Sequence, residues 1–107
     1  MILLFLACSG GADTADTAPA ACADAPNVTW ASFGDGFFAT YCRACHSANT
    51  AERYGAPEAV NFDTLADVRT FQDSVRRTVL DDQSMPVGGG VYDDDAMLLD
   101  YFLTCGL

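Results

Sequence analysis

Apolar residues recur at helical spacing in three stretches of the chain, and the first stretch follows Trp30. We expect a helix capped by Ser32, because a serine hydroxyl can accept a hydrogen bond from a free backbone amide of the first turn. Its apolar positions, spaced at i, i+4 and i+8, are Phe33, Phe37 and Tyr41. Gly34 and Gly36 weaken such a helix by about 1 kcal/mol each relative to alanine, so we expect a packing reason for them. The helix is expected to run into residues 42–46.

The second predicted helix follows a loop over residues 49–61 and is capped by Asp63 or Thr64. Its apolar positions are Leu65, Val68, Phe71 or Gln72, Val75 and Val79. The helix must end before Met85-Pro86, because a residue that precedes proline is driven out of the helical conformation.

A third helix is predicted to open at residues 93–95, which are all aspartate and suit the positive end of a helix dipole. Its apolar face consists of Met97, Leu98, Tyr101, Phe102 and Cys105. No stretch alternates with a period of two over the length of a strand, so the sequence predicts an all-α domain.

The first quarter of the chain has a different composition. Residues 1–8 look like the end of a secretory signal with a bacterial lipoprotein cleavage site, in which Cys8 would carry the lipid. A frayed apolar terminus is the alternative. Residues 9–27 are small and polar, without aromatic or branched aliphatic side chains, and are expected to form a flexible tether. The folded domain is therefore predicted over residues 28–107.

Charge and size restrict what the protein can bind. The chain has 107 residues, with 15 acidic and 5 basic ones, and a formal net charge of −10. Nucleic acid and anionic lipid surfaces would repel it, so a protein partner should present a basic face, and contact with a membrane is expected only through lipid on Cys8. A chain of this size often needs a disulfide, a metal or a cofactor to stabilise its small core.

The only histidine of the chain ends the segment Cys42-Arg43-Ala44-Cys45-His46. A structural zinc site would need a fourth ligand, and neither a second histidine nor a second C-x-x-C pair exists. A dithiol redox motif normally lies between a strand and a helix, which this chain lacks. The C-x-x-C-H pattern is typical of covalent haem attachment, because two thiols at i and i+3 share a helix face and the next residue reaches the iron. The spacing therefore favours one covalent haem c over a structural zinc site or a dithiol redox motif.

The residues around this motif resemble the class I cytochromes c, a family of small monohaem proteins. The features that carry the resemblance are Gly34-x-x-x-Phe38-x-x-x-Cys42-x-x-Cys45-His46, Met85-Pro86 and Leu98-x-x-Tyr101-Phe102. The resemblance covers roughly residues 30–105. It implies a small cytochrome c fold in which three main helices surround one haem, and in which an aromatic residue of the last helix packs across Gly34.

The resemblance also implies the axial ligands of the iron. Cys42 and Cys45 would hold the haem, His46 would be the proximal ligand, and Met85 would be the distal ligand. An ordinary core methionine is the alternative for Met85. A carbonyl near residues 55–57 would accept a hydrogen bond from the second nitrogen of His46 and so fix its tautomer.

Two cysteines remain if Cys8 is lipidated and the motif carries haem. Cys22 and Cys105 form an even pair in a compartment where disulfides persist, so we expect a bridge between them. Two independent thiols are the alternative.

Iron with an imidazole on one side and a thioether on the other has no open position for a substrate. We therefore expect a monomeric electron carrier, not an enzyme, on the periplasmic side of a bacterial membrane, lipid-anchored or secreted, exchanging single electrons with redox proteins. The alternatives are a haem c subunit or domain of an oxidoreductase or peroxidase, and a gas sensor in which Met85 is displaced.

Overall fold

Three α-helices make up the part of the chain that the computed structural model describes, residues 22–107, and no strand occurs in this part. The helices are α1 (Asp35–Tyr41), α2 (Leu65–Val75) and α3 (Asp93–Cys105). A π-helical segment η3 (Trp30–Gly34) leads into α1, and a second, η4 (Arg76–Asp81), continues α2. The predicted all-α class is confirmed for these residues. Residues 1–21, with the predicted lipid site Cys8 and most of the predicted tether, lie outside the described part.

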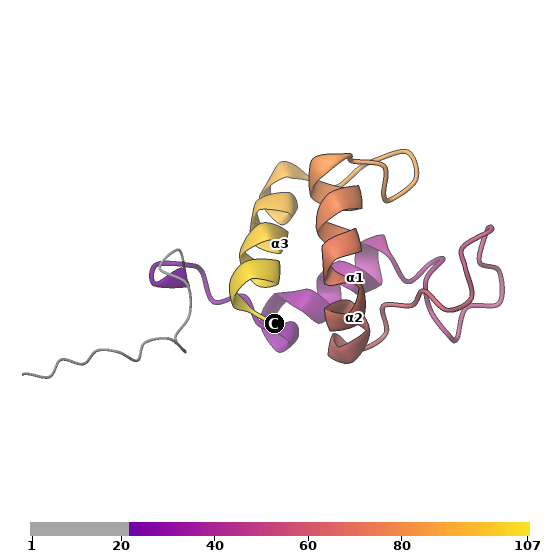
Figure 1. The fold of residues 1–107 in the computed structure, drawn as a ribbon, viewed down its shortest axis with the longest axis horizontal. Helices are drawn as coiled ribbons and strands as arrows, with labels where there is room; N and C mark the ends of the chain where they lie inside the picture. Colours follow the sequence, from indigo (N-terminus) through magenta and orange to yellow (C-terminus); the bar gives the residue numbers. More distant parts are fainter. Residues whose placement is uncertain (1–21) are drawn as a thin grey trace, which may run out of the picture.

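Figure 1 shows how the helices are arranged. α3 stands beside the orange helix formed by the end of α2 and η4, while α1 and the segment before it pass across their lower ends. Contacts between α3 and both π-helical segments hold the arrangement together. None of the helices described in residues 22–107 has the length and apolar character needed to cross a bilayer.

The first helix begins three residues earlier than its sequence predicts. Thr29, not Ser32, is the N-cap of η3. The Ser32 amide donates to the Thr29 hydroxyl at 3.0 Å, and the Thr29 amide donates to the Ser32 hydroxyl at 2.8 Å. In this reciprocal capping box each side chain satisfies a backbone amide of the other residue, so Ser32 takes part in the cap from inside the helix.

The second helix begins at a similar capping box. Thr64, one of the two predicted caps, accepts from the Asp67 amide at 3.1 Å, and the Asp67 carboxylate accepts from the Thr64 amide at 3.2 Å. The helical run through η4 ends at Asp81, before Met85-Pro86 as predicted. Of the two alternatives for its apolar face, Phe71 packs its ring against Phe62, with 5.9 Å between the centroids.

The third helix has the predicted start but a different buried face. Leu99, Phe102 and Leu103 are buried in the core, whereas Met97, which the pattern placed on the apolar face, is 54% exposed. The stretch from Met97 to Leu103 offers more apolar positions than one face of a helix can bury. Which of them face the core is therefore decided by packing and not by the pattern.

Close contact between Gly34 and Phe102 joins the first and last helices. A Cβ added at Gly34 would lie 2.7 Å from Phe102 Cζ and 2.8 Å from Trp30 Cε3, so only glycine fits without displacing these rings. This gives Gly34 the packing reason that was expected. The same expectation is wrong for Gly36, where an added Cβ would meet nothing within 4 Å.

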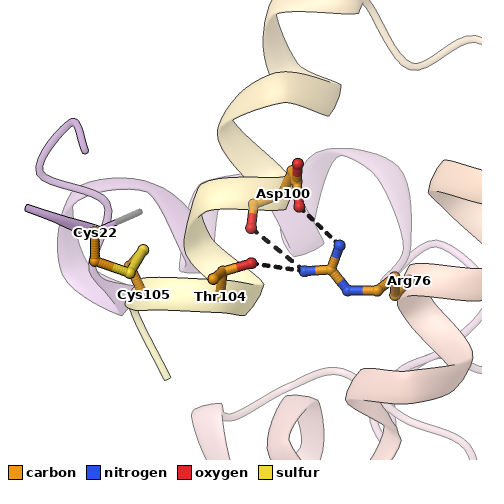
Figure 2. The surroundings of a disulfide bond; sticks show 5 residues. All are labelled: Cys22, Arg76, Asp100, Thr104 and Cys105. Carbon is orange, nitrogen blue, oxygen red and sulfur yellow. Dashed lines mark hydrogen bonds and ion pairs between the residues drawn. A yellow bond between two sulfur atoms is a disulfide. The ribbon is translucent and has the colours of Figure 1, made fainter. Parts of the chain in front are cut away.

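A disulfide joins Cys22 to Cys105, the last residue of α3, with 5.6 Å between the two Cα atoms. It attaches the segment that precedes η3 to the C-terminal end of the domain (Figure 2). Nearby, the Arg76 guanidinium donates to Asp100 at 2.7 Å and to the Thr104 hydroxyl at 2.9 Å. The terminal turns of α3 are thus held covalently on one side and by η4 on the other.

Candidate functional site

The Cys-x-x-Cys-His motif forms a turn at the end of α1. The helix ends at Tyr41, and Cys42 is its C-cap, so the motif begins where the helix stops instead of continuing it. The amides of Cys45 and His46 both donate to the Cys42 carbonyl, at 3.2 and 2.9 Å. This i+3 and i+4 bonding keeps the motif compact.

Two adjoining cavities lie against the motif. The larger, of about 550 Å³, is lined by Cys42, Cys45, His46 and Met85 among others. The smaller, of about 290 Å³, shares three of these, Cys42, His46 and Met85. Its remaining wall comes mainly from the core side of α2 and η4 and from the loop before them: Phe62, Phe71, Val75 and Val79. Such volumes are typical of pockets for a small molecule or cofactor.

His46 is oriented by a backbone carbonyl. Its Nδ1 lies 3.0 Å from the carbonyl oxygen of Val60, and its ring meets the Phe62 ring edge to face at 5.6 Å between centroids. Because a carbonyl oxygen only accepts, Nδ1 must carry a proton, so in the neutral imidazole Nε2 is the nitrogen with a lone pair available to bind a metal. The predicted carbonyl acceptor from this loop is present, but it is the carbonyl of Val60 and not one at residues 55–57.

Arg53 organises the loop that supplies this carbonyl, a role that its sequence position did not reveal. Its guanidinium donates to the carbonyls of Ser47 at 2.6 Å, Pro57 at 2.7 Å and Val60 at 2.9 Å. The loop over residues 49–61 has no regular secondary structure to pair its carbonyls, so one fork-shaped cation gathers them. Arg53 also forms part of the wall of the larger cavity.

Arg43, inside the motif, attaches the turn to its surroundings. Its Nε donates to the Phe62 carbonyl at 2.7 Å, and its Nη2 donates to the Asp35 carboxylate, also at 2.7 Å. The guanidinium lies over the Trp30 ring, 5.6 Å from its centroid. These contacts connect the motif to both α1 and the segment that orients His46.

A carboxylate next to the motif holds the turn that follows His46. The Ser47 hydroxyl donates to Asp63 at 2.6 Å, and the Ala48 amide donates to the second oxygen of the same carboxylate at 2.8 Å. The Ser47 hydrogen bond, then the Ala48 amide and the charges of Arg43 and Arg53, lower the pKa of Asp63.

The two thiols of the motif are free in this structure. Burial raises the pKa of the Cys42 thiol to about 12, against the smaller opposing effect of Arg43. Dithiol oxidoreductases need the opposite, a lowered thiol pKa that produces a thiolate near neutral pH. The environment of Cys42 thus disfavours the dithiol alternative.

Met85 lies on the loop after η4. Its backbone amide donates to the Thr78 carbonyl at 3.1 Å, and Ser84 donates to the same oxygen at 2.8 Å. These bonds tie the start of the loop to η4, and the Met85 side chain, 39% exposed, lines both cavities. The glycines at 88–90, all with positive φ, follow it.

The donor set of the larger cavity fits a covalent haem. Two thiols from one turn, an imidazole with a free Nε2 and a thioether from another loop line one mostly apolar space. No cluster of three or more His, Cys, Asp or Glu side chains suited to a metal ion occurs within residues 22–107. Comparison with known proteins found no family model, no curated protein and no solved structure that matches the chain.

Proposed function

We propose that this protein is a small monohaem c-type cytochrome that carries single electrons between redox proteins. The observation that carries the proposal is that Cys42, Cys45, His46 and Met85, the four residues singled out by the sequence, all line one cavity. Chance is a poor explanation for this, because Met85 is separated from the motif by the whole of α2 and η4.

Each of these residues has a defined part in the proposal. Cys42 and Cys45 would attach a haem through thioether bonds, and His46 and Met85 would ligate its iron. When bound, the haem would supply a one-electron Fe(III)/Fe(II) couple. His46 is held by the Val60 carbonyl with Nε2 free. The soft Met85 sulfur favours ferrous iron and so raises the reduction potential.

The fold supports the same proposal. The contact of Phe102 with Gly34 is the helix crossing that the resemblance to class I cytochromes c implies. Gly34 immediately precedes α1, and the motif follows the other end of the same helix. A cytochrome c fold, with the three helices around the haem, is accordingly part of the proposal.

We also propose a periplasmic location, as a protein either secreted or lipid-anchored through Cys8. The disulfide between Cys22 and Cys105 favours an oxidising compartment, where c-type haem is also attached. The net charge of −10 favours redox partners with a basic docking face, and the protein is expected to act as a monomer.

A gas sensor is the second candidate, because Met85 is 39% exposed and is followed by three consecutive glycines. In such a sensor the Met85 bond would give way to a diatomic gas. Reduced protein that binds carbon monoxide readily, without any substitution, would favour the sensor over the carrier.

The proposal is tested by the intact mass of the full chain after expression with a haem c maturation system. Under denaturing conditions we expect the mass of one haem in addition to the polypeptide, and loss of that increment in a Cys42→Ala, Cys45→Ala double variant. A Met85→Ala variant should keep the haem but lose the far-red ferric absorption band of methionine ligation. Met97→Ala, an exposed methionine on α3, is the matched control and should keep both. Wild-type protein with the mass of the bare polypeptide would contradict the proposal.

A further inference from the structure

Arg53 and His46 share one hydrogen-bond acceptor. The Val60 carbonyl oxygen lies 2.9 Å from Arg53 Nη2 and 3.0 Å from His46 Nδ1. A carbonyl oxygen has two lone pairs, so both donors can be accommodated at once. The side chain that organises the loop therefore contacts the same atom that orients the proposed iron ligand.

The two donors are not equivalent. Arg53 carries a full positive charge, and charge-assisted hydrogen bonds are roughly twice as strong as neutral ones. Neither of the two ion pairs found within residues 22–107 involves Arg53. Its charge is instead directed at backbone carbonyls, of which that of Val60 is one. Arg53 should therefore take the larger share of the electron density on this oxygen.

The strength of the His46 hydrogen bond matters to iron chemistry. A strong acceptor at Nδ1 gives the imidazole anionic character and makes Nε2 a better electron donor, which stabilises ferric iron. A weakened acceptor has the opposite effect and favours ferrous iron.

We infer that Arg53 is a positioning residue that tunes His46: by drawing on the Val60 carbonyl it weakens the His46 hydrogen bond and raises the reduction potential. This inference rests on the proposed function, because it concerns the electron density that His46 offers to iron. It goes beyond that function by assigning the control of the potential to a residue outside the ligand set.

Arg53 could also raise the potential simply by being a positive charge beside the cavity. Two substitutions separate these effects. Arg53→Lys keeps the charge but replaces the planar fork with a point donor that cannot bridge the same carbonyls. Arg53→Gln removes both the positive charge and the planar guanidinium group. The matched control is Arg69→Gln, which removes an exposed arginine of α2 that lines neither cavity.

The experiment measures, on haem-loaded full-length protein, the equilibrium of electron exchange with a reference mediator. We expect Arg53→Lys and Arg53→Gln each to shift this equilibrium about threefold or more toward oxidised protein, where tenfold corresponds to about 59 mV for one electron. Arg69→Gln should shift it much less. The His46 Nδ1 proton of the reduced protein should move downfield in the NMR spectrum of Arg53→Lys, as its hydrogen bond strengthens. An unchanged potential and an unchanged proton resonance in Arg53→Lys would overturn the inference.

Wild-type protein provides a second test that needs no substitution, in case an Arg53 variant fails to mature. Two protons that are hydrogen-bonded to the same oxygen are close in space. We therefore expect a nuclear Overhauser effect between the Nη2 protons of Arg53 and the Nδ1 proton of His46. Its absence would refute the shared acceptor. A pyridine haemochrome measurement on the same sample comes first: a sample without haem contradicts the proposed function, whereas a haem-loaded sample that fails the Arg53 tests contradicts only this inference.

Discussion

Replacing Gly34 by alanine tests the contact that joins the first helix to the last. The new methyl group would lie 2.7 Å from Phe102 Cζ and 3.0 Å from Phe102 Cε1. The Phe102 ring is fully buried and packs against Phe33 and Phe38, so it can move away from Gly34 only by displacing other core side chains. Overpacking of this kind costs about 1–3 kcal/mol, and the higher helix propensity of alanine returns up to about 1 kcal/mol.

When the full helix-propensity gain of about 1 kcal/mol is subtracted, the net loss in the free energy of unfolding should be about 0–2 kcal/mol. For a domain of this size, each kcal/mol changes Tm by about 4–8 °C. The matched control lies two residues further along: Gly36 in α1 is exposed, and an alanine methyl there would meet nothing. Gly36→Ala should raise the free energy of unfolding by about 0.5–1 kcal/mol, since it gains propensity without a clash.

Thermal unfolding followed by far-UV circular dichroism, with the disulfide intact, measures both variants. A double-mutant cycle adds the atomic detail: in a Phe102→Leu background the ring atoms nearest Gly34 are gone, so Gly34→Ala should cost less, with a coupling of about 0.5–3 kcal/mol. The packing argument would be refuted if Gly34→Ala matched Gly36→Ala in Tm, or if the cost of Gly34→Ala were unchanged in the Phe102→Leu background.

The remaining predictions concern the disulfide, Asp63 and Met85. Replacing both Cys22 and Cys105 by alanine removes a bridge over a sequence separation of 83 and should lower the free energy of unfolding by about 2–5 kcal/mol, measured from urea midpoints; equal midpoints for the variant and the oxidised wild type would contradict this. The lowered pKa of Asp63 means that its contribution to stability is present above the pKa of an unfolded aspartate and is lost as pH falls through the folded value. Asp63→Asn should therefore weaken the fall in the free energy of unfolding at acid pH. Asp73→Asn, at an exposed position, should leave that fall unchanged. Met85→Ala should let the reduced, haem-loaded protein bind carbon monoxide and lower its reduction potential, and a Met97→Ala variant that did the same would contradict the assignment of Met85 as ligand.

Local signals were enough to predict most of the helices. Thr64 and the three aspartates at 93–95 mark helix starts through backbone amides and the helix dipole, which act within a few residues of the chain. The start of the first helix was harder, because in a reciprocal capping box Thr29 and Ser32 both satisfy an amide of the other residue. Either residue is then a reasonable cap from the sequence alone.

Features that depend on long-range packing were beyond the sequence pattern. The buried face of α3 is set by the docking of Phe102 on Gly34, which turns Leu99 and Leu103 inward and Met97 outward. The carbonyl that accepts from His46 belongs to the loop whose carbonyls Arg53 binds. A loop has no periodic pattern of apolar residues, so the sequence does not predict which of its carbonyls faces His46. The motif residues were identifiable because their chemistry depends on a short, fixed spacing.

A pyridine haemochrome spectrum of the matured full-length protein tests the central claim most directly. It reports both the number of haems per chain and whether both vinyl groups have been converted to thioethers. We predict one haem per chain with both vinyl groups saturated, as attachment to Cys42 and Cys45 requires. A folded, colourless protein, or one whose haem can be extracted by acid and organic solvent, would contradict the claim.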